Sequence, residues 1–77
     1  MEIIESEHWK KKKAYRADIE DYMVEFAINN SRRQRDMHHH DALNAIARIP
    51  QTGKRLKVVF RIVGKDKVKL ITSYYLD

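Results

Sequence analysis

Residues 55–76, RLKVVFRIVGKDKVKLITSYYL, constrain the fold more than any other part of the chain. Two stretches alternate apolar and polar residues and are rich in β-branched and aromatic side chains, which is typical of β-strands. The short turn Gly64-Lys65-Asp66 separates them. This pattern predicts a tight β-hairpin.

The two strands are expected to have one apolar and one basic face, because successive side chains of a strand point in opposite directions. The apolar face is predicted to hold Leu56, Val58, Phe60, Ile62, Val68, Leu70, Thr72, Tyr74 and Leu76. The other face is predicted to hold Lys57, Val59, Arg61, Val63, Lys67, Lys69, Ile71, Ser73 and Tyr75.

Two helices are predicted ahead of the hairpin. The segment ADIEDYMVEFAINN has apolar residues at helical spacing, with Asp18 as the expected N-cap, and its apolar stripe would cover the sheet. That stripe is predicted to comprise Ile19, Tyr22, Met23, Phe26 and Ala27. The preceding SEHWKKKKAYR predicts a shorter helix that begins at Ser6, is anchored by Trp9 and exposes its lysines.

The segment HDALNAIARI fits two structures, because its alanines and leucine favour a helix while alternate apolar positions from Leu43 to Ile49 fit a strand. The turn from Pro50 to Gly53 is short enough for a second hairpin. We therefore favour a strand over residues 43–49, the first of a three-stranded meander, although propensity alone leaves residues 42–49 open.

Length and composition narrow the class of protein. The 77 residues predict one domain, 1–77, with a thin core, and the absence of cysteine excludes disulfides and cysteine nucleophiles. No apolar run has the length of a signal peptide or a membrane span, so a cytoplasmic protein without membrane contact is expected. The net charge of +5 predicts attraction to phosphate polymers or to an acidic protein.

The run NAIARIPQTGKRLKVVFRIVGKDKVKLITSYYLD resembles the strand meander of small RelE-like proteins, in particular BrnT-type toxins and related small domains of unknown function. The matching positions are Gly53, Arg55, Leu56, Val58, Val59, Phe60, Ile71 and Thr72. The resemblance implies an α+β fold with N-terminal helices on one face of a small antiparallel sheet of about three to four strands, ending in a β-meander. Many RelE-like members are endoribonucleases that act as the toxin of a toxin–antitoxin pair, so the resemblance also implies this activity.

Such ribonucleases commonly place arginine, lysine, histidine or tyrosine on the open sheet face and at the end of the last strand. The expected catalytic residues are Arg48, Arg61 and Tyr75, which match this placement by type and strand position, together with His40. His40 is the histidine nearest the first meander strand, and imidazole titrates near neutral pH. The expected nucleic-acid-binding residues are Arg33, Arg35, Lys57 and Lys69.

The triplet His38-His39-His40 permits a metal site, since imidazole binds zinc, nickel and copper. Adjacent side chains diverge, however, and no H-x-x-x-H spacing is present, so we predict neither a metal nor a cofactor. A polar loop is the alternative for the triplet. The alternative interpretation of the basic strand face is a solvated surface whose lysines prevent edge-to-edge aggregation.

Three classes of function follow from these observations. The first is an RNA-acting toxin-type protein, either a metal-independent endoribonuclease or an inactive relative, with an antitoxin or another acidic protein as partner. The second is a non-catalytic basic module that binds nucleic acid or protein. The third is a structural protein that forms a homodimer through an uncovered sheet edge. Whether the protein is an enzyme stays open at this point.

Overall fold

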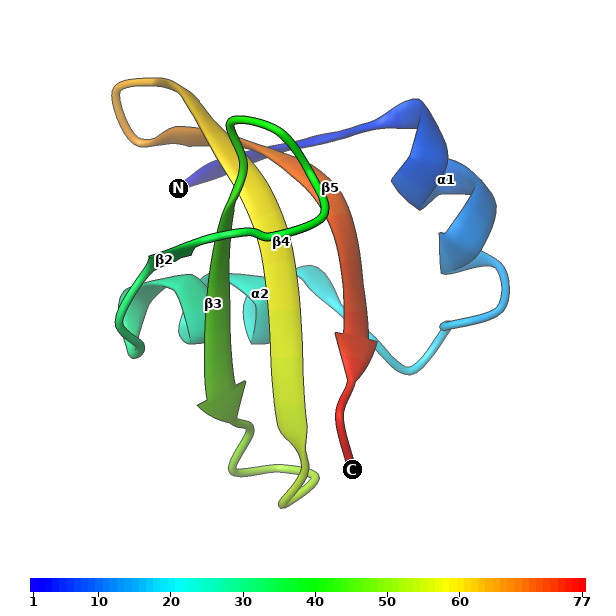
Figure 1. Cartoon of the computed structure of the whole chain (residues 1–77). Coiled ribbons are helices and arrows are strands. Elements are labelled where there is room, and N and C mark those ends of the chain that lie inside the picture. Colours follow the sequence, from blue (N-terminus) through cyan, green and yellow to red (C-terminus); the bar gives the residue numbers. More distant parts are fainter.

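The computed structural model describes all of residues 1–77, with two helices against a five-stranded mixed sheet of order β1-β5-β4-β3-β2 (Figure 1). The helices are α1 (Glu7–Lys13) and α2 (Asp21–Asn29). The strands are β1 (Glu2–Glu5), β2 (Gln34–Arg35), β3 (Leu43–Arg48), β4 (Arg55–Gly64) and β5 (Lys67–Tyr75). The predicted α+β class is confirmed. Neither helix has the length and apolar character needed to cross a lipid bilayer.

The antiparallel meander is confirmed, because β3, β4 and β5 pair antiparallel in chain order and residues 43–48 form a strand. The sequence analysis did not predict β1, which runs parallel to β5 with Ile3 opposite Val68. Four residues are too few to show an alternating pattern, and β1 is a strand only because the distant β5 supplies its partner. The sheet is therefore mixed and has more strands than predicted.

The first helix follows the prediction. The Ser6 side chain accepts a hydrogen bond from the Trp9 backbone N–H at 3.1 Å, and the Trp9 side chain is buried. Such a cap satisfies one of the free N–H groups in the first turn of a helix. The cap thus holds α1 where Trp9 enters the core.

The second helix differs from the prediction in its start and in its buried stripe. It begins at Asp21, after an N-cap position occupied by Glu20, and Asp18 caps nothing. Ile19 is buried but lies ahead of the helix, so its position does not define the helical face. The stripe that packs on β3 and β4 consists of Met23, Val24, Ala27 and Ile28, while Tyr22 is exposed and Phe26 is only partly buried.

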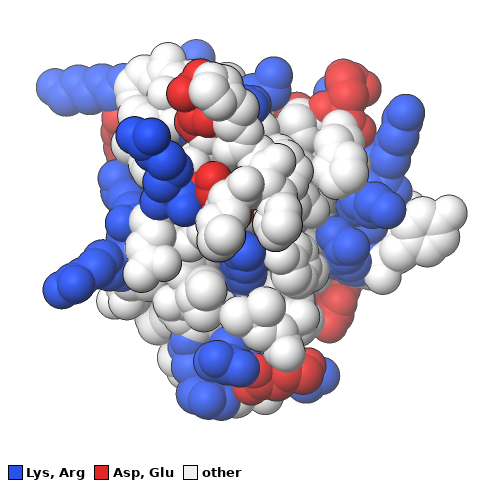
Figure 2. Space-filling view, in the orientation of Figure 1, with Lys and Arg blue, Asp and Glu red and all other residues white.

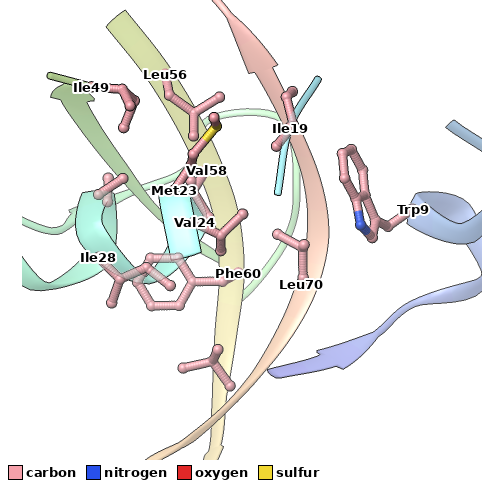
Figure 3. Close-up of a cluster of buried hydrophobic side chains, with 13 residues drawn as sticks. Trp9, Ile19, Met23, Val24, Ile28, Ile49, Leu56, Val58, Phe60 and Leu70 are labelled. Atoms are coloured by element: carbon pink, nitrogen blue, oxygen red, sulfur yellow. The ribbon is translucent and has the colours of Figure 1, made fainter. Parts of the chain in front are cut away.

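The main core lies between the helices and one face of the sheet, as Figure 3 shows. Its largest fully buried side chains are those of Trp9, Phe60, Ile28, Ile49, Leu56 and Leu70. Burial of such apolar surface is the main favourable contribution to folding. We call the opposite face of the sheet the open face.

A β-bulge at Ile71 inverts the faces of the residues that follow it in β5. Phe60 pairs with Leu70, but the preceding β4 residue, Val59, pairs with Thr72. One extra residue in a strand moves every later side chain to the other face. The face predictions are therefore wrong for four residues. The register places Thr72 and Tyr74 on the open face, and Ser73 and Tyr75 on the face toward the helices.

The bulge is tied to the start of α1, and this tie yields a stability prediction. The buried Ser6 hydroxyl donates to the Ile71 carbonyl at 3.0 Å while also capping α1. Replacing Ser6 by alanine should lower the free energy of unfolding by about 1–2 kcal/mol, because both interactions are lost. Urea denaturation followed by circular dichroism measures this change.

The matched control is Ser31→Ala, because the partly exposed Ser31 hydroxyl makes a single hydrogen bond, to the Ala27 carbonyl. That control should lower the free energy of unfolding by only about 0.5 kcal/mol or less. Equal effects of the two substitutions would show that the link between cap and bulge contributes nothing.

Candidate functional site

The connection between β2 and β3 lies across the open face. Figure 1 shows it passing in front of β4 toward β5 before it enters β3. We call residues 36–42 the histidine loop. Its last residue, Ala42, is buried in a small apolar cluster with Val59 and Ile71. The triplet is thus in a connecting segment, as predicted, but the segment is packed against the sheet.

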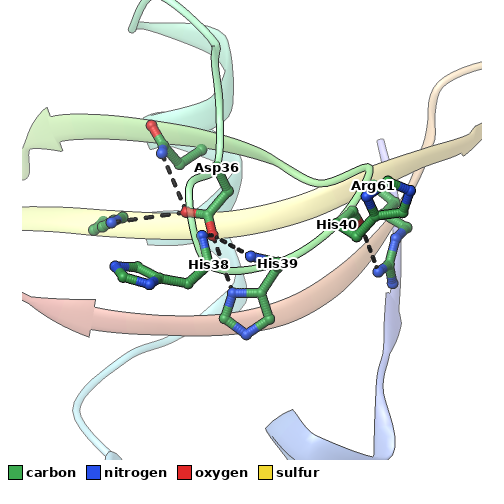
Figure 4. Close-up of polar contacts among 7 residues, drawn as sticks. Asp36, His38, His39, His40 and Arg61 are labelled. Carbon is green, nitrogen blue, oxygen red and sulfur yellow. Dashed lines mark hydrogen bonds and ion pairs between the residues drawn. The ribbon is translucent and has the colours of Figure 1, made fainter.

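One carboxylate organises the histidine loop (Figure 4). The Asp36 side chain is only 1% exposed. Its Oδ2 accepts hydrogen bonds from the His38 and His39 backbone N–H groups at 3.0 and 2.9 Å, and from His39 Nδ1 at 3.0 Å. Its Oδ1 accepts one from Asn44 Nδ2 at 3.2 Å. The loop therefore turns around a buried, fully hydrogen-bonded carboxylate.

Asp36 is ionised at neutral pH. Burial alone would raise the pKa of this carboxyl, but the hydrogen bonds from His39, Asn44 and two backbone amides outweigh burial and lower the pKa to about 2. The Lys57 ammonium, 3.8 Å from Oδ1 and itself largely buried, adds a nearby positive charge. A fixed negative charge is therefore held beneath the loop.

The contact with Asp36 gives His39 a defined proton arrangement. A carboxylate only accepts hydrogen bonds, so the neutral imidazole carries its proton on Nδ1 and has a lone pair on Nε2. No protein group bonds Nε2, and the side chain is 37% exposed. A carboxylate that holds one imidazole nitrogen while the other stays free is the arrangement of a general base.

The sequence analysis selected His40 rather than His39. The His40 ring is 92% exposed, and its only partner is the neighbouring Asp41, at 3.1 Å. Three adjacent histidines look equivalent in the sequence. The choice among them depends on how the backbone turns around Asp36, which places the His39 side chain, and not that of His40, against the carboxylate.

Two predicted basic residues lie together on the open face beside the histidine loop. Arg61 is directly opposite Lys69 in the β4–β5 ladder. Arg61 Nη2 also donates to the His40 carbonyl at 2.9 Å, which ties the loop to β4, while Lys69 is exposed. These side chains bring two cations to the hairpin side of the loop.

A second group lies on the other side of the loop, around Tyr74. Arg16 Cζ is 5.6 Å from the centroid of the Tyr74 ring, and Lys57 Nζ is 5.8 Å from it. Arg16 Nη1 donates to Thr72 Oγ1 and to the Ser73 carbonyl, both at 3.2 Å. Neither Arg16 nor Tyr74 was predicted as a site residue, and Tyr74 was predicted to lie on the apolar face. The adjacent tyrosines in TSYY were a signal for one stacking ring, but only the bulge decides which one faces outward.

The structure separates the remaining predicted site residues from this group. Tyr75 packs on the helix side, where its hydroxyl lies 3.4 Å from Met23 Sδ, and burial raises its pKa. Arg48 is on the open face at the far end of β3, where it bonds the Gly53 carbonyl and pairs with Asp77 at 3.6 Å. These residues lie apart from the histidine loop.

The arginines around β2 also lie elsewhere. Arg33 lies over the Phe60 ring on the helix side and lines a hollow of about 240 Å³ near the β4–β5 turn. Arg35 is exposed opposite Leu43, whose side chain packs toward the core. Figure 2 shows lysine and arginine side chains spread around the margin of the open face rather than in one continuous patch.

Two further results bear on the chemistry of the site. No three histidine, aspartate or glutamate side chains converge into a set that could hold a metal ion. Comparison with known proteins finds no match, whether among protein-family models, curated proteins or solved structures. The resemblance to RelE-like proteins therefore stays a prediction.

Proposed function

We propose that this protein is an RNA-acting protein of the toxin type that cleaves RNA without a metal ion, with His39 as the general base. The observation that carries the proposal is the buried, ionised Asp36 bonded to His39 Nδ1 on a face that also presents Arg61 and Lys69. The resemblance of the strand meander to RelE-like ribonucleases supports the same activity.

In the proposed reaction His39 Nε2 takes the proton of a ribose 2′-hydroxyl. The 2′-oxygen then bonds to the adjacent phosphorus as the bond from phosphorus to the 5′-oxygen breaks, and water protonates the leaving oxygen. The imidazolium of His39 gives its proton to the hydroxide that remains, which restores the neutral base. The products are a 2′,3′-cyclic phosphate and a 5′-hydroxyl. Asp36 stabilises the imidazolium that forms, while Arg61 and Lys69 stabilise the negative charge on the phosphorane.

An acidic protein such as an antitoxin is the partner that fits this proposal. The chain carries a net charge of +5, so an acidic segment would be attracted to the same surface as RNA. Such a partner would compete with RNA for the open face and suppress cleavage.

Cleavage of single-stranded RNA in the presence of EDTA tests the proposal. The His39→Gln variant should cleave about 10²–10⁴-fold more slowly, because a positioned general base contributes a rate factor of that size. The reaction is followed on denaturing gels, and the 2′,3′-cyclic phosphate is identified by mass spectrometry. RNA with a 2′-deoxy sugar at the cleaved position should stay intact.

The matched control is His40→Gln, which changes the exposed neighbour and should leave the rate unchanged. If both glutamine variants lose activity equally, His39 has no special role. RNA that is bound but intact at high protein concentration would contradict cleavage and favour a non-catalytic binding module.

A further inference from the structure

The cluster around Tyr74 is distinct from the proposed cleavage site. Along β4 and β5, the pair Arg61 and Lys69 lies toward the hairpin, and the pair Lys57 and Tyr74 lies toward the other end. Val59 lies between them, under the histidine loop. The open face therefore presents an aromatic ring with two cations on one side of the loop, and the phosphate-stabilising cations on the other.

The two cations near the Tyr74 ring are held differently. Arg16 is fixed by hydrogen bonds to Thr72 and to the Ser73 carbonyl, so its guanidinium is locked in place against the ring. The Lys57 ammonium makes no hydrogen bond, and its partners are the Asp36 carboxylate, at 3.8 Å, and the Tyr74 ring. The lysine side chain can therefore swing from the ring to a phosphate and leave ring surface for another planar group.

We infer that Tyr74 and Arg16 form a stacking subsite for an unpaired base, so that the RNA recognised by this face is single-stranded. A tyrosine ring beside a fixed guanidinium binds any base through its π-face, and Lys57 would neutralise the adjoining phosphate. The bases of a duplex are already stacked and paired, and they offer no such face. This inference rests on the proposed function for its substrate class.

The position of Lys57 links the subsite to the proposed base. Its ammonium is 3.8 Å from Asp36 and 5.8 Å from the Tyr74 ring centroid. Lys57 thus lies close both to the Tyr74 ring and to the carboxylate that holds His39, so a phosphate bound by Lys57 would lie near the histidine loop. The stacked base would position the neighbouring ribose at His39 Nε2.

Binding of a fluorescently labelled RNA of about 12 nucleotides, within the length range that such surfaces cover, tests the subsite by anisotropy. The His39→Gln background prevents cleavage during the measurement. The single strand should bind more tightly than a duplex of the same sequence. Tyr74→Leu should weaken binding of the single strand by about tenfold, and Tyr74→Phe should retain it because the ring is kept.

The control is Tyr22→Leu, which removes an exposed tyrosine from α2 on the other side of the sheet. Its affinity for RNA should equal that of the His39→Gln background. Thermal unfolding of each variant shows whether the fold is kept, and Tyr74→Phe against Tyr74→Leu separates loss of the ring from loss of the hydroxyl.

The outcomes for the subsite and for cleavage are distinguishable. Equal affinity for single strand and duplex, an unchanged affinity of Tyr74→Leu, or no RNA binding at all would overturn the stacking subsite. Tight, Tyr74-dependent binding without cleavage by the unmodified protein would overturn only the proposed function. Cleavage that does not depend on Tyr74 would overturn only the subsite.

Discussion

Replacing Trp9 by alanine is expected to lower the free energy of unfolding by about 3–5 kcal/mol, because a fully buried aromatic side chain is deleted. The Trp9 side chain is 1% exposed, and Figure 3 shows it projecting from α1 toward the side of β5 that carries Leu70. A domain of this size has a total stability of about 4–12 kcal/mol. The variant should therefore lose about a quarter or more of the stability of the domain.

Urea denaturation followed by far-ultraviolet circular dichroism measures the effect of Trp9→Ala, since the variant has no tryptophan fluorescence. The control is Tyr15→Ala, which removes an aromatic side chain that is 88% exposed and should change stability by about 0.5 kcal/mol or less. If the Trp9→Ala variant were as stable as the wild type, the packing of α1 would contribute nothing to the core.

Replacing Asp36 by alanine is expected to lower the free energy of unfolding by about 2–3 kcal/mol at neutral pH. The substitution leaves partly buried donors of the histidine loop and the buried Asn44 amide without their acceptor, and it leaves Lys57 without its counter-charge. Urea denaturation gives the size of the change. In an assay of the proposed RNA cleavage, the same variant should lose most of any activity that depends on His39.

The effect of Asp36 should depend on pH in a defined direction. Its pKa is lowered from 3.8 to about 2 in the folded protein. The charged carboxylate therefore favours folding at every pH at which Asp36 is also ionised in the unfolded chain. This contribution, about 2 kcal/mol, is present above about pH 4 and is lost as the pH falls to about 2. Wild type and Asp36→Ala should therefore converge in stability over that window.

Asp18→Ala is the control for this pH dependence, because Asp18 is exposed and is neither a hydrogen-bond nor an ion-pair partner. Its stability should follow that of the wild type from neutral to acidic pH. A constant difference between Asp36→Ala and the wild type across the acidic window would contradict the assignment of a low pKa to Asp36.

The parts of the fold that were predicted correctly are those in which local sequence and tertiary structure agree. The β4–β5 turn and the start of α1 at Ser6 each depend on residues close together in the chain. The sequence analysis missed β1, whose pairing partner is distant, and the bulge at Ile71. Residues 70–75, LITSYY, do not alternate clearly between apolar and polar types, so the sequence does not show where the faces change.

The candidate site was predicted in outline but not in its key residues. The open basic face, Arg61 and Lys69 follow from strand alternation before the bulge. The role of Asp36 depends on loop geometry, and Arg16 reaches Thr72 across 56 positions of the chain. Such contacts exist only in the folded protein, and side chains that form them carry no local signal.

The pairing of β1 with β5 has a consequence for biosynthesis. Residues 2–5 leave the ribosome well before their ladder partners, residues 67–70. Until then Trp9 has no β5 to pack against, and a nascent chain exposes apolar surface. Pairing between such distant segments is slow because a large loop has to close first. The sheet can thus be completed only once β5 has been synthesised.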